Sequence, residues 1–160
     1  MTVAGLWVVF VCTGNTCRSP MAARVLTDRL TAGIRENIVV SSRGTDPVEV
    51  GAGMDARARR ALTGRGLDSG EHRVCRLQTE DIAATDLFVA LSREHVARLI
   101  SLGADDSQII LLGMFDPEQP GVDVPDPFES DQAAYEAVLT QIERCMPGLL
   151  IELTARAQTP

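Results

Sequence analysis

A cysteine and an arginine, Cys12 and Arg18, flank five residues in the segment CTGNTCRSP. A cysteine thiolate is a strong nucleophile, and the planar guanidinium of arginine can bind two oxygens of one phosphate. The pair therefore predicts nucleophilic attack on phosphorus, in which Cys12 forms the bond and Arg18 holds the phosphate. The spacing alone is weak support, because four cysteines and 15 arginines in 160 residues produce it easily by chance.

The residues around this pair predict a loop that binds an anion. Gly14 and Asn15 are the residue types that most readily adopt positive φ, which a tight loop requires. Inward-pointing backbone N–H groups and the dipole of a following helix bind a dianionic phosphate. In that field we expect Cys12 to ionise readily and the Ser19 hydroxyl to hydrogen-bond its thiolate. The predicted phosphate-binding loop residues are Thr13, Gly14, Asn15, Thr16, Cys17 and Ser19.

A cysteine nucleophile also needs a proton donor for the leaving group. A long proline-rich segment contains three candidates, Asp116, Asp123 and Asp126. Asp126 lies between two prolines in VPDPF, and these would hold it in a rigid, extended loop. An Asp-Pro pair is by itself usually only a turn. The chemistry of the residues therefore leaves the choice among the three aspartates open.

Strands and helices that alternate along the chain must position these residues. Apolar runs rich in β-branched and aromatic residues predict strands at 6–12, 37–42, 86–91 and 108–112. Helical spacing and glycine stop signals predict helices at 18–31, 55–65, 92–102 and 131–157. Ser19 and Pro20 are expected as N-cap and first residue of one helix, and Pro147 as a bend or break in another.

This alternation indicates an α/β fold with right-handed crossovers between parallel strands. We expect a three-layer sandwich whose four-stranded parallel sheet has the order 2-1-3-4 and carries helices on both faces. The phosphate-binding loop follows the first strand, at the sheet edge where such folds bind ligands. The chain has the length of one domain, which we expect to span residues 1–160. Trp7 is expected in the core.

Composition narrows the classes of partner. Twenty-two acidic and 15 basic residues give a net charge of −7, which argues against nucleic acid or an anionic membrane as the main ligand. All the basic residues are arginines, so a Schiff-base lysine or a Walker-type lysine is excluded. The apolar stretch at 3–12 is about half of a membrane span and lacks signal-peptide features. We expect a cytoplasmic protein with reduced thiols, no metal and no cofactor.

The motif VCTGNTCRSPMA, followed far along the chain by VPDPF, resembles the low-molecular-weight protein-tyrosine phosphatase family. The segment SRGT, residues 42–45, is similar to a Ser-Ala-Gly-Thr string of that family, and the likeness extends over nearly the whole chain. The resemblance implies a four-stranded parallel sheet, a phosphorylated protein as substrate, and no metal or organic cofactor. We also expect a monomer.

The resemblance implies a role for each residue that touches the reacting phosphate. Cys12 would be the nucleophile, Arg18 would bind the phosphate and its transition state, and Asp126 would act as general acid and then general base. The implied reaction is a double displacement. Cys12 takes the phosphoryl group as a phosphocysteine, and water activated by Asp126 then releases inorganic phosphate.

The resemblance gives other residues supporting roles. Ser19 would stabilise the thiolate, while Asn15 and Ser42 would brace the loop by hydrogen bonds. Cys17 lies five residues from Cys12, close enough in a curled loop for a reversible disulfide. We therefore expect peroxide to inactivate the protein through this thiol pair and dithiothreitol to restore it.

Three positions differ from tyrosine-specific members of the family and bear on the substrate. Thr16 replaces a residue that is typically isoleucine and resembles the bacterial protein-arginine phosphatase subgroup. Val48 stands at a wall position that is often aromatic, and Phe128 followed by Glu129 replaces a tyrosine pair. These changes thin the walls for an aromatic ring, so the sequence favours phosphoarginine. Phosphotyrosine is the alternative, because Phe128 could still stack on a phenol ring.

Two further alternatives are weaker. A thiol-linked arsenate reductase would need resolving cysteines after the third strand, and residues 91–95 contain none. A redox or phosphate sensor without turnover would not need the complete set of Cys12, Arg18 and Asp126. His72 and His95 are expected at the surface or behind the residues that contact the substrate, with a minor substrate contact open to His95.

Overall fold

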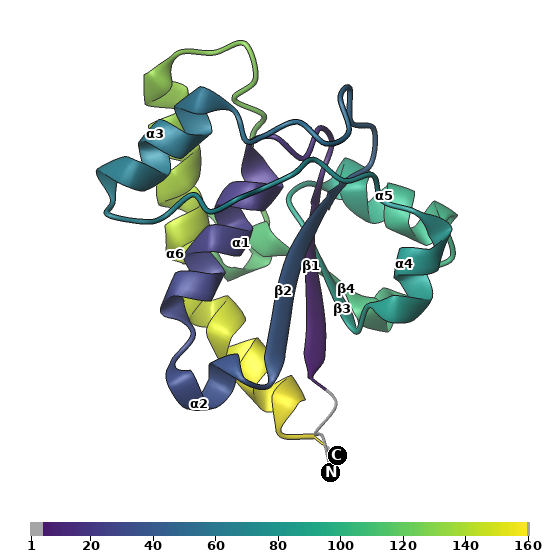
Figure 1. The fold of residues 1–160 in the computed structure, drawn as a ribbon. Coiled ribbons are helices and arrows are strands. Elements are labelled where there is room, and N and C mark those ends of the chain that lie inside the picture. Colours follow the sequence, from purple (N-terminus) through teal and green to yellow (C-terminus); the bar gives the residue numbers. More distant parts are fainter. Residues whose placement is uncertain (1–4, 160) are drawn as a thin grey trace.

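A computed structural model describes residues 5–159, and its centre is a four-stranded parallel sheet (Figure 1). The order β2-β1-β3-β4 confirms the predicted topology. All paired strands run parallel, and β1 is bonded on both sides. The strands are β1 Leu6–Cys12, β2 Ile38–Gly44, β3 Leu87–Ala90 and β4 Ile109–Leu111.

Helices connect the strands and cover the sheet. The α-helices are α1 Arg18–Arg29, α2 Ala32–Arg35, α3 Ala56–Gly64, α4 Thr79–Ala84, α5 Arg93–Ser101 and α6 Gln132–Ala157. Short 3₁₀ helices span Asp106–Gln108 and Leu112–Phe115. Helices α2 and α4 were not predicted, because four and six residues show too little periodicity to be recognised. No helix within residues 5–159 combines the length and the apolar character needed to cross a bilayer.

The alternation of side chains along β1 divides the core between the two faces of the sheet. Val8 and Phe10 belong to a large apolar cluster with residues of α1, α3 and α6. Val9 and Val11 point the other way, into a smaller cluster that includes Leu99 of α5. Figure 1 shows α1, α3 and α6 on one side of the sheet and α4 and α5 on the other. The structure is therefore the expected three-layer sandwich.

The start of α1 differs from the prediction. Its N-cap is Cys17, and no side chain caps the helix, so the prediction of Ser19 as N-cap is wrong. Ser19 instead lies inside the first turn and is fully buried. Its hydroxyl lies 2.9 Å from both Cys12 Sγ and Asn15 Nδ2, so it is engaged with the preceding loop rather than with the helix end.

Two other expectations are wrong in part or in full. Pro147 does not break the last helix: α6 continues through it and buries side chains on both sides of the proline, from Tyr135 to Leu153. That burial outweighs a helix penalty of about 3 kcal/mol. Trp7 is not in the core: its side chain is 48% exposed beside the partly exposed Val39, its partner on β2. This corner of the sheet faces solvent.

Candidate active site

The carboxyl end of β1 leads directly into the loop of residues 13–17, and the chain after β2 supports that loop. The Thr45 N–H donates to the Cys12 carbonyl, and the Asp46 N–H donates to the Thr13 carbonyl, both at 2.9 Å. A Cβ on Gly44 would lie 2.7 Å from the Thr13 carbonyl oxygen, so only glycine permits this approach without a shift. The end of β2 thus fixes the backbone on which Cys12 is carried.

Asn15 determines the curl of the loop. Its φ is +57°, in the left-handed region, and its side chain is fully buried. The Asn15 Nδ2 group donates to Ser19 Oγ and to Ser42 Oγ, both at 2.9 Å. Its Oδ1 accepts from the Cys75 N–H at 2.9 Å. The amide is therefore hydrogen-bonded at both ends, and Ser42 occupies the bracing position that the sequence assigned to it.

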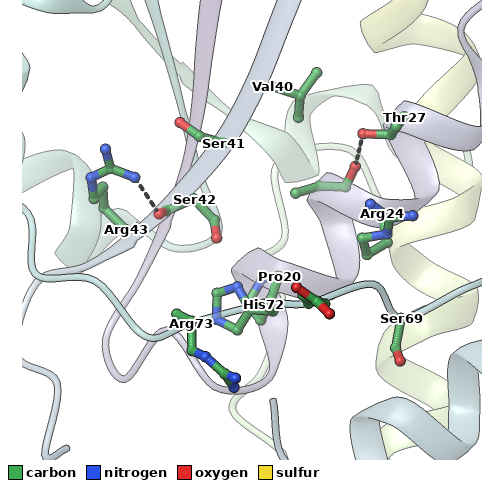
Figure 2. A pocket seen from close by; sticks show the side chains of 12 residues that line it. Pro20, Arg24, Thr27, Val40, Ser41, Ser42, Arg43, Ser69, His72 and Arg73 are labelled. Atoms are coloured by element: carbon green, nitrogen blue, oxygen red, sulfur yellow. Dashed lines mark hydrogen bonds between the residues drawn. The ribbon is translucent and has the colours of Figure 1, made fainter. Parts of the chain in front are cut away.

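His72 also supports Asn15, although no motif pointed to it. Its Nε2 lies 2.7 Å from the Asn15 carbonyl oxygen. Burial lowers the pKa of His72 below its ordinary value, so the ring is neutral at neutral pH and Nε2–H donates this bond. Figure 2 shows His72 with Pro20 and Ser42 around a second pocket, of about 260 Å³. His72 thus contacts the loop from a pocket that Cys12 does not line.

Two donors converge on the sulfur of Cys12, which is almost completely buried. The Ser19 hydroxyl lies 2.9 Å from Sγ, and the Asn15 N–H donates to Sγ at 3.3 Å. Hydrogen bonds that point at a sulfur stabilise negative charge that collects on it during a reaction. Cys12 is therefore held with two polar groups directed at the atom that would attack phosphorus.

Arg18 begins α1 and connects the loop to the proline-rich segment. Its guanidinium is buried, and Nη1 donates to the Val124 carbonyl at 3.1 Å. Nη2 lies 3.5 Å from Asp126 Oδ2. The Asp126 side chain is 52% exposed, and its Oδ1 accepts from the Phe128 N–H at 3.0 Å. One arginine thus brings the aspartate to the mouth of the loop.

The other two aspartates are engaged elsewhere. Asp116 is buried and accepts from Nε and Nη2 of Arg144 at 3.0 and 2.8 Å. Hydrogen bonds from this guanidinium hold the pKa of Asp116 below its ordinary value. Asp123 accepts from the backbone N–H and from Nη1 of Arg93. Of the three candidates, Asp126 alone lines the pocket that contains Cys12.

The pocket over the loop has a volume of about 350 Å³. The predicted wall residues Val48 and Phe128 line it, but their side chains are 99% and 56% exposed. Two carboxylates that sequence reasoning missed, Asp46 and Glu49, also line it. The lining residues are Cys12, Thr13, Gly14, Asn15, Thr16, Cys17, Arg18, Asp46, Val48, Glu49, Ala52, Asp126 and Phe128.

Cys17, the last residue of the loop, is buried in the same apolar cluster as Cys12. Its Sγ is 3.4 Å from Thr16 Oγ1 and 3.4 Å from the hydroxyl of Tyr135 in α6. Burial raises the pKa of the Cys17 thiol. Cys12 and Cys17 are both free thiols in the structure. Within residues 5–159, no three His, Cys, Asp or Glu side chains gather in a way that could hold a metal ion.

His95, in the first turn of α5, is the second histidine at the loop. Its side chain is 1% exposed, and its Nε2 lies 2.9 Å from Thr13 Oγ1. Burial, aided by the nearby charge of Arg18, lowers the pKa of His95 to about 4. The ring is therefore neutral at neutral pH, and its 3.5 Å approach to Glu94 is not an ion pair there. The sequence predicted a place at the surface or behind the residues that contact the substrate, and His95 lies behind the pocket residue Thr13.

Comparison with known proteins identifies one family. A family model described as "Low molecular weight phosphotyrosine protein phosphatase" matches residues 7–159. The low molecular weight protein-tyrosine phosphatase A of Mycobacterium tuberculosis (strain H37Rv) is 40% identical over 147 residues, which cover 90% of this chain and 89% of that protein. The low molecular weight protein-tyrosine-phosphatase of Streptomyces coelicolor is 37% identical over 151 residues, covering 89% of this chain and 90% of the relative.

Solved structures include a neighbour with a different substrate in its name. The YwlE arginine phosphatase from Geobacillus stearothermophilus superposes with a TM-score of 0.78 and 28% identity, over 94% of each chain. The named relatives therefore include both tyrosine and arginine phosphatases.

The buried His95 and the half-buried His72 predict a pH-dependent stability. The folded-state pKa of His95 is lowered from 6.5 to about 4, so the unfolded chain binds a proton first as the pH falls. The free energy of unfolding should therefore be highest above pH 6.5 and fall by on the order of 3 kcal/mol towards pH 4. His72 contributes in the same direction. Urea unfolding across this range should show a smaller fall for His95→Gln; equal falls would contradict the assignment.

Proposed function

The chain belongs to the low molecular weight phosphotyrosine protein phosphatase family, and we propose that it hydrolyses phosphorylated protein side chains with Cys12, Arg18 and Asp126. The family consists of protein phosphatases with cysteine-based catalysis. One observation supports this assignment of residues most strongly: a buried sulfur with two hydrogen-bond donors, a buried guanidinium and a half-exposed carboxylate share one pocket.

The first step transfers the phosphoryl group to sulfur. The Cys12 thiolate attacks phosphorus, and the bond between phosphorus and the leaving atom of the substrate breaks. Asp126, in its protonated form, gives its proton to that leaving atom. Arg18 and the loop N–H groups bind the equatorial oxygens, where negative charge is concentrated in the transition state. The products are a phosphocysteine and the unmodified side chain.

The second step regenerates the thiol. Asp126, now a carboxylate, takes a proton from water, and the water oxygen attacks the phosphorus of the phosphocysteine. The sulfur–phosphorus bond breaks, releasing inorganic phosphate and the Cys12 thiolate. The Ser19 hydroxyl, 2.9 Å from Cys12 Sγ, stabilises the negative charge that returns to sulfur. The Ser19 hydroxyl and the Asn15 N–H therefore support the sulfur both as the attacking atom and as the leaving atom.

The pocket supports phosphoarginine as the preferred substrate. The guanidinium of phosphoarginine is positively charged and needs hydrogen-bond acceptors for its N–H groups. The Thr16 hydroxyl and the carboxylates of Asp46 and Glu49 line the pocket and are acceptors of this kind. Thr16 can donate to Cys17 Sγ, 3.4 Å away, while its oxygen accepts from the substrate. The name of the Geobacillus stearothermophilus relative agrees with this choice.

Phosphotyrosine is the second candidate, and specific observations favour it. The relatives from Mycobacterium tuberculosis and Streptomyces coelicolor, at 40% and 37% identity, are both named as tyrosine phosphatases. Phe128 lines the pocket and could stack on a phenol ring. Val48 would contribute little to such a wall, because its side chain is 99% exposed. The preferred substrate therefore depends on whether polar contacts to a guanidinium or stacking on Phe128 contributes more.

We also propose that Cys17 protects Cys12 from irreversible oxidation. Peroxide would convert the Cys12 thiolate to a sulfenic acid, and Cys17 Sγ would attack that sulfur, forming a disulfide and releasing water. Burial raises the pKa of Cys17, so it stays protonated and does not compete with Cys12 for the oxidant. A thiol reductant then reverses the bond.

Replacing Asp126 by asparagine should remove the proton donor without loosening the fold. We expect kcat to fall roughly a hundredfold or more, with a wild-type midpoint of thermal unfolding. Asp116→Asn is the matched control: it breaks the buried contact with Arg144 and should cost roughly 2 kcal/mol of stability while leaving the chemistry intact. Steady-state kinetics and urea unfolding of both variants check this. A large kcat loss in Asp116→Asn alone would contradict the choice of Asp126.

The substrate proposal predicts a preference that one substitution reverses. Wild type should have the higher kcat/KM on a phosphoarginine peptide than on the matched phosphotyrosine peptide. Thr16→Ile removes the hydroxyl acceptor and adds an apolar wall, so the ratio should change by about tenfold or more towards phosphotyrosine. A preference for phosphotyrosine in both proteins would leave the tyrosine phosphatase assignment standing and overturn the role of Thr16.

Oxidation experiments test the thiol pair. After brief exposure to peroxide, wild-type activity should return with dithiothreitol, since the disulfide is reducible. Cys17→Ser should recover much less, because unprotected Cys12 proceeds to the irreversible sulfinic acid. Activity after reduction, with peptide mass analysis of residues 12–17, measures both outcomes. Equal recovery of the two proteins would count against a protective role of Cys17.

A further inference from the structure

The ring of His95 uses its two nitrogens for two different contacts. On one side, the Ser92 N–H donates to Nδ1 at 3.1 Å, and Ser92 Oγ lies 2.9 Å from the same nitrogen. The bond from the Ser92 N–H is one half of the capping box at the start of α5. Because Nδ1 accepts from a backbone N–H, it carries no proton. The proton of the neutral ring is therefore on Nε2.

The protonated nitrogen faces the catalytic loop. Nε2–H donates to Thr13 Oγ1 at 2.9 Å, and the Thr13 hydroxyl donates onward to Glu94 Oε1 at 3.3 Å. The donors thus run in one direction, from the Ser92 backbone through the ring to Thr13. The low pKa of His95 keeps this direction fixed at neutral pH, because a doubly protonated ring could no longer accept from Ser92.

Thr13 is consequently held at two points. Its carbonyl accepts from the Asp46 N–H, and its hydroxyl is bonded to His95. Thr13 directly follows Cys12, and both line the pocket over the loop. We propose that His95 is a positioning residue of the phosphatase reaction, which fixes Thr13 and thereby aims Cys12 Sγ and the loop N–H groups at phosphorus. The proposal rests on the function proposed above, because it assumes that Cys12 is the nucleophile.

A purely structural role would involve a different atom of the same ring. The cap of α5 depends on Nδ1, whereas the contact with the loop depends on Nε2. The ring also faces other charged groups: Arg18, Asp123 and Asp126 act on it electrostatically, and Glu94 lies 3.5 Å from Nε2. Substitutions that keep one nitrogen's contact and remove the other's can separate the two roles without adding a charge.

Asparagine and glutamine provide that separation. The His95→Asn amide lies near the position of Nδ1, so it keeps an acceptor for the Ser92 N–H but does not reach Thr13. The His95→Gln amide extends to the position of Nε2 and can donate to Thr13 Oγ1. We expect kcat on p-nitrophenyl phosphate to fall about tenfold to a hundredfold in His95→Asn, with little change in KM. His95→Gln should restore most of kcat.

A double-mutant cycle with Thr13→Val makes the test independent of the cap. Thr13→Val removes the hydroxyl and leaves His95 and Ser92 in place, so it should lower kcat by a similar factor. His95→Asn should then add little further loss in the Thr13→Val background. The proposal would be overturned if the kcat losses of His95→Asn and Thr13→Val multiply in the double variant. Equal kcat losses in His95→Asn and His95→Gln, or a wild-type kcat in His95→Asn, would also overturn it.

Two control measurements separate a failure of the positioning role from a failure of the proposed function. Thermal unfolding followed by circular dichroism establishes that each variant is folded; if His95→Asn is not, an unchanged kcat in Thr13→Val still overturns the proposal. Wild type is measured with the same substrate. An inactive wild type would overturn the proposed function itself, whereas an active wild type with an unaffected His95→Asn would overturn only the positioning role.

Discussion

The buried side chain of Asn15 is the constraint on which the site depends. A non-glycine residue at φ +57° is strained by about 1–3 kcal/mol, and it persists only where its surroundings fix it. Here the side-chain amide of Asn15 is hydrogen-bonded to Ser19, Ser42 and the Cys75 N–H. The backbone carbonyl of Asn15 accepts from His72. These bonds, each contributing about 1 kcal/mol, offset the strain. The resulting loop directs the Asn15 N–H at Cys12 Sγ and connects β1 to α1.

The distribution of charge around Cys12 is the second feature of the site. The chain carries a net charge of −7, yet a buried arginine, Arg18, lines the pocket over the loop. The guanidinium bonds the Val124 carbonyl and lies beside Asp126, so the group proposed to bind phosphate also holds the segment that carries the proposed acid. The carboxylates of Asp46, Glu49 and Asp126 line the same pocket. The phosphoarginine proposed as substrate combines a phosphate with a cation and would use both kinds of charge.

The sequence predicts best the features that depend on residues close together in the chain. Strand β1, the loop after it and helix α1 are contiguous, and their residue types point to one chemistry. Topology also follows, because the alternation of strands and helices restricts it. The specific contacts of His72 and His95 with the loop could not be predicted, since these residues reach it from distant segments of the chain. Ser19 was misplaced for a different reason: its hydroxyl is engaged with the neighbouring residues Cys12 and Asn15 instead of the helix end. Trp7 was misplaced because its corner of the sheet is left uncovered.

The central claim is that hydrolysis passes through a phosphoryl group on Cys12. The most direct measurement is acid quenching during turnover of a phosphorylated substrate, followed by peptide mass analysis. We predict one phosphoryl group on the peptide that contains Cys12 in wild type and none in Cys12→Ala. Its level should be higher in Asp126→Asn than in wild type if hydrolysis of the intermediate slows more than its formation. Phosphate release by Cys12→Ala at the wild-type rate would contradict the account.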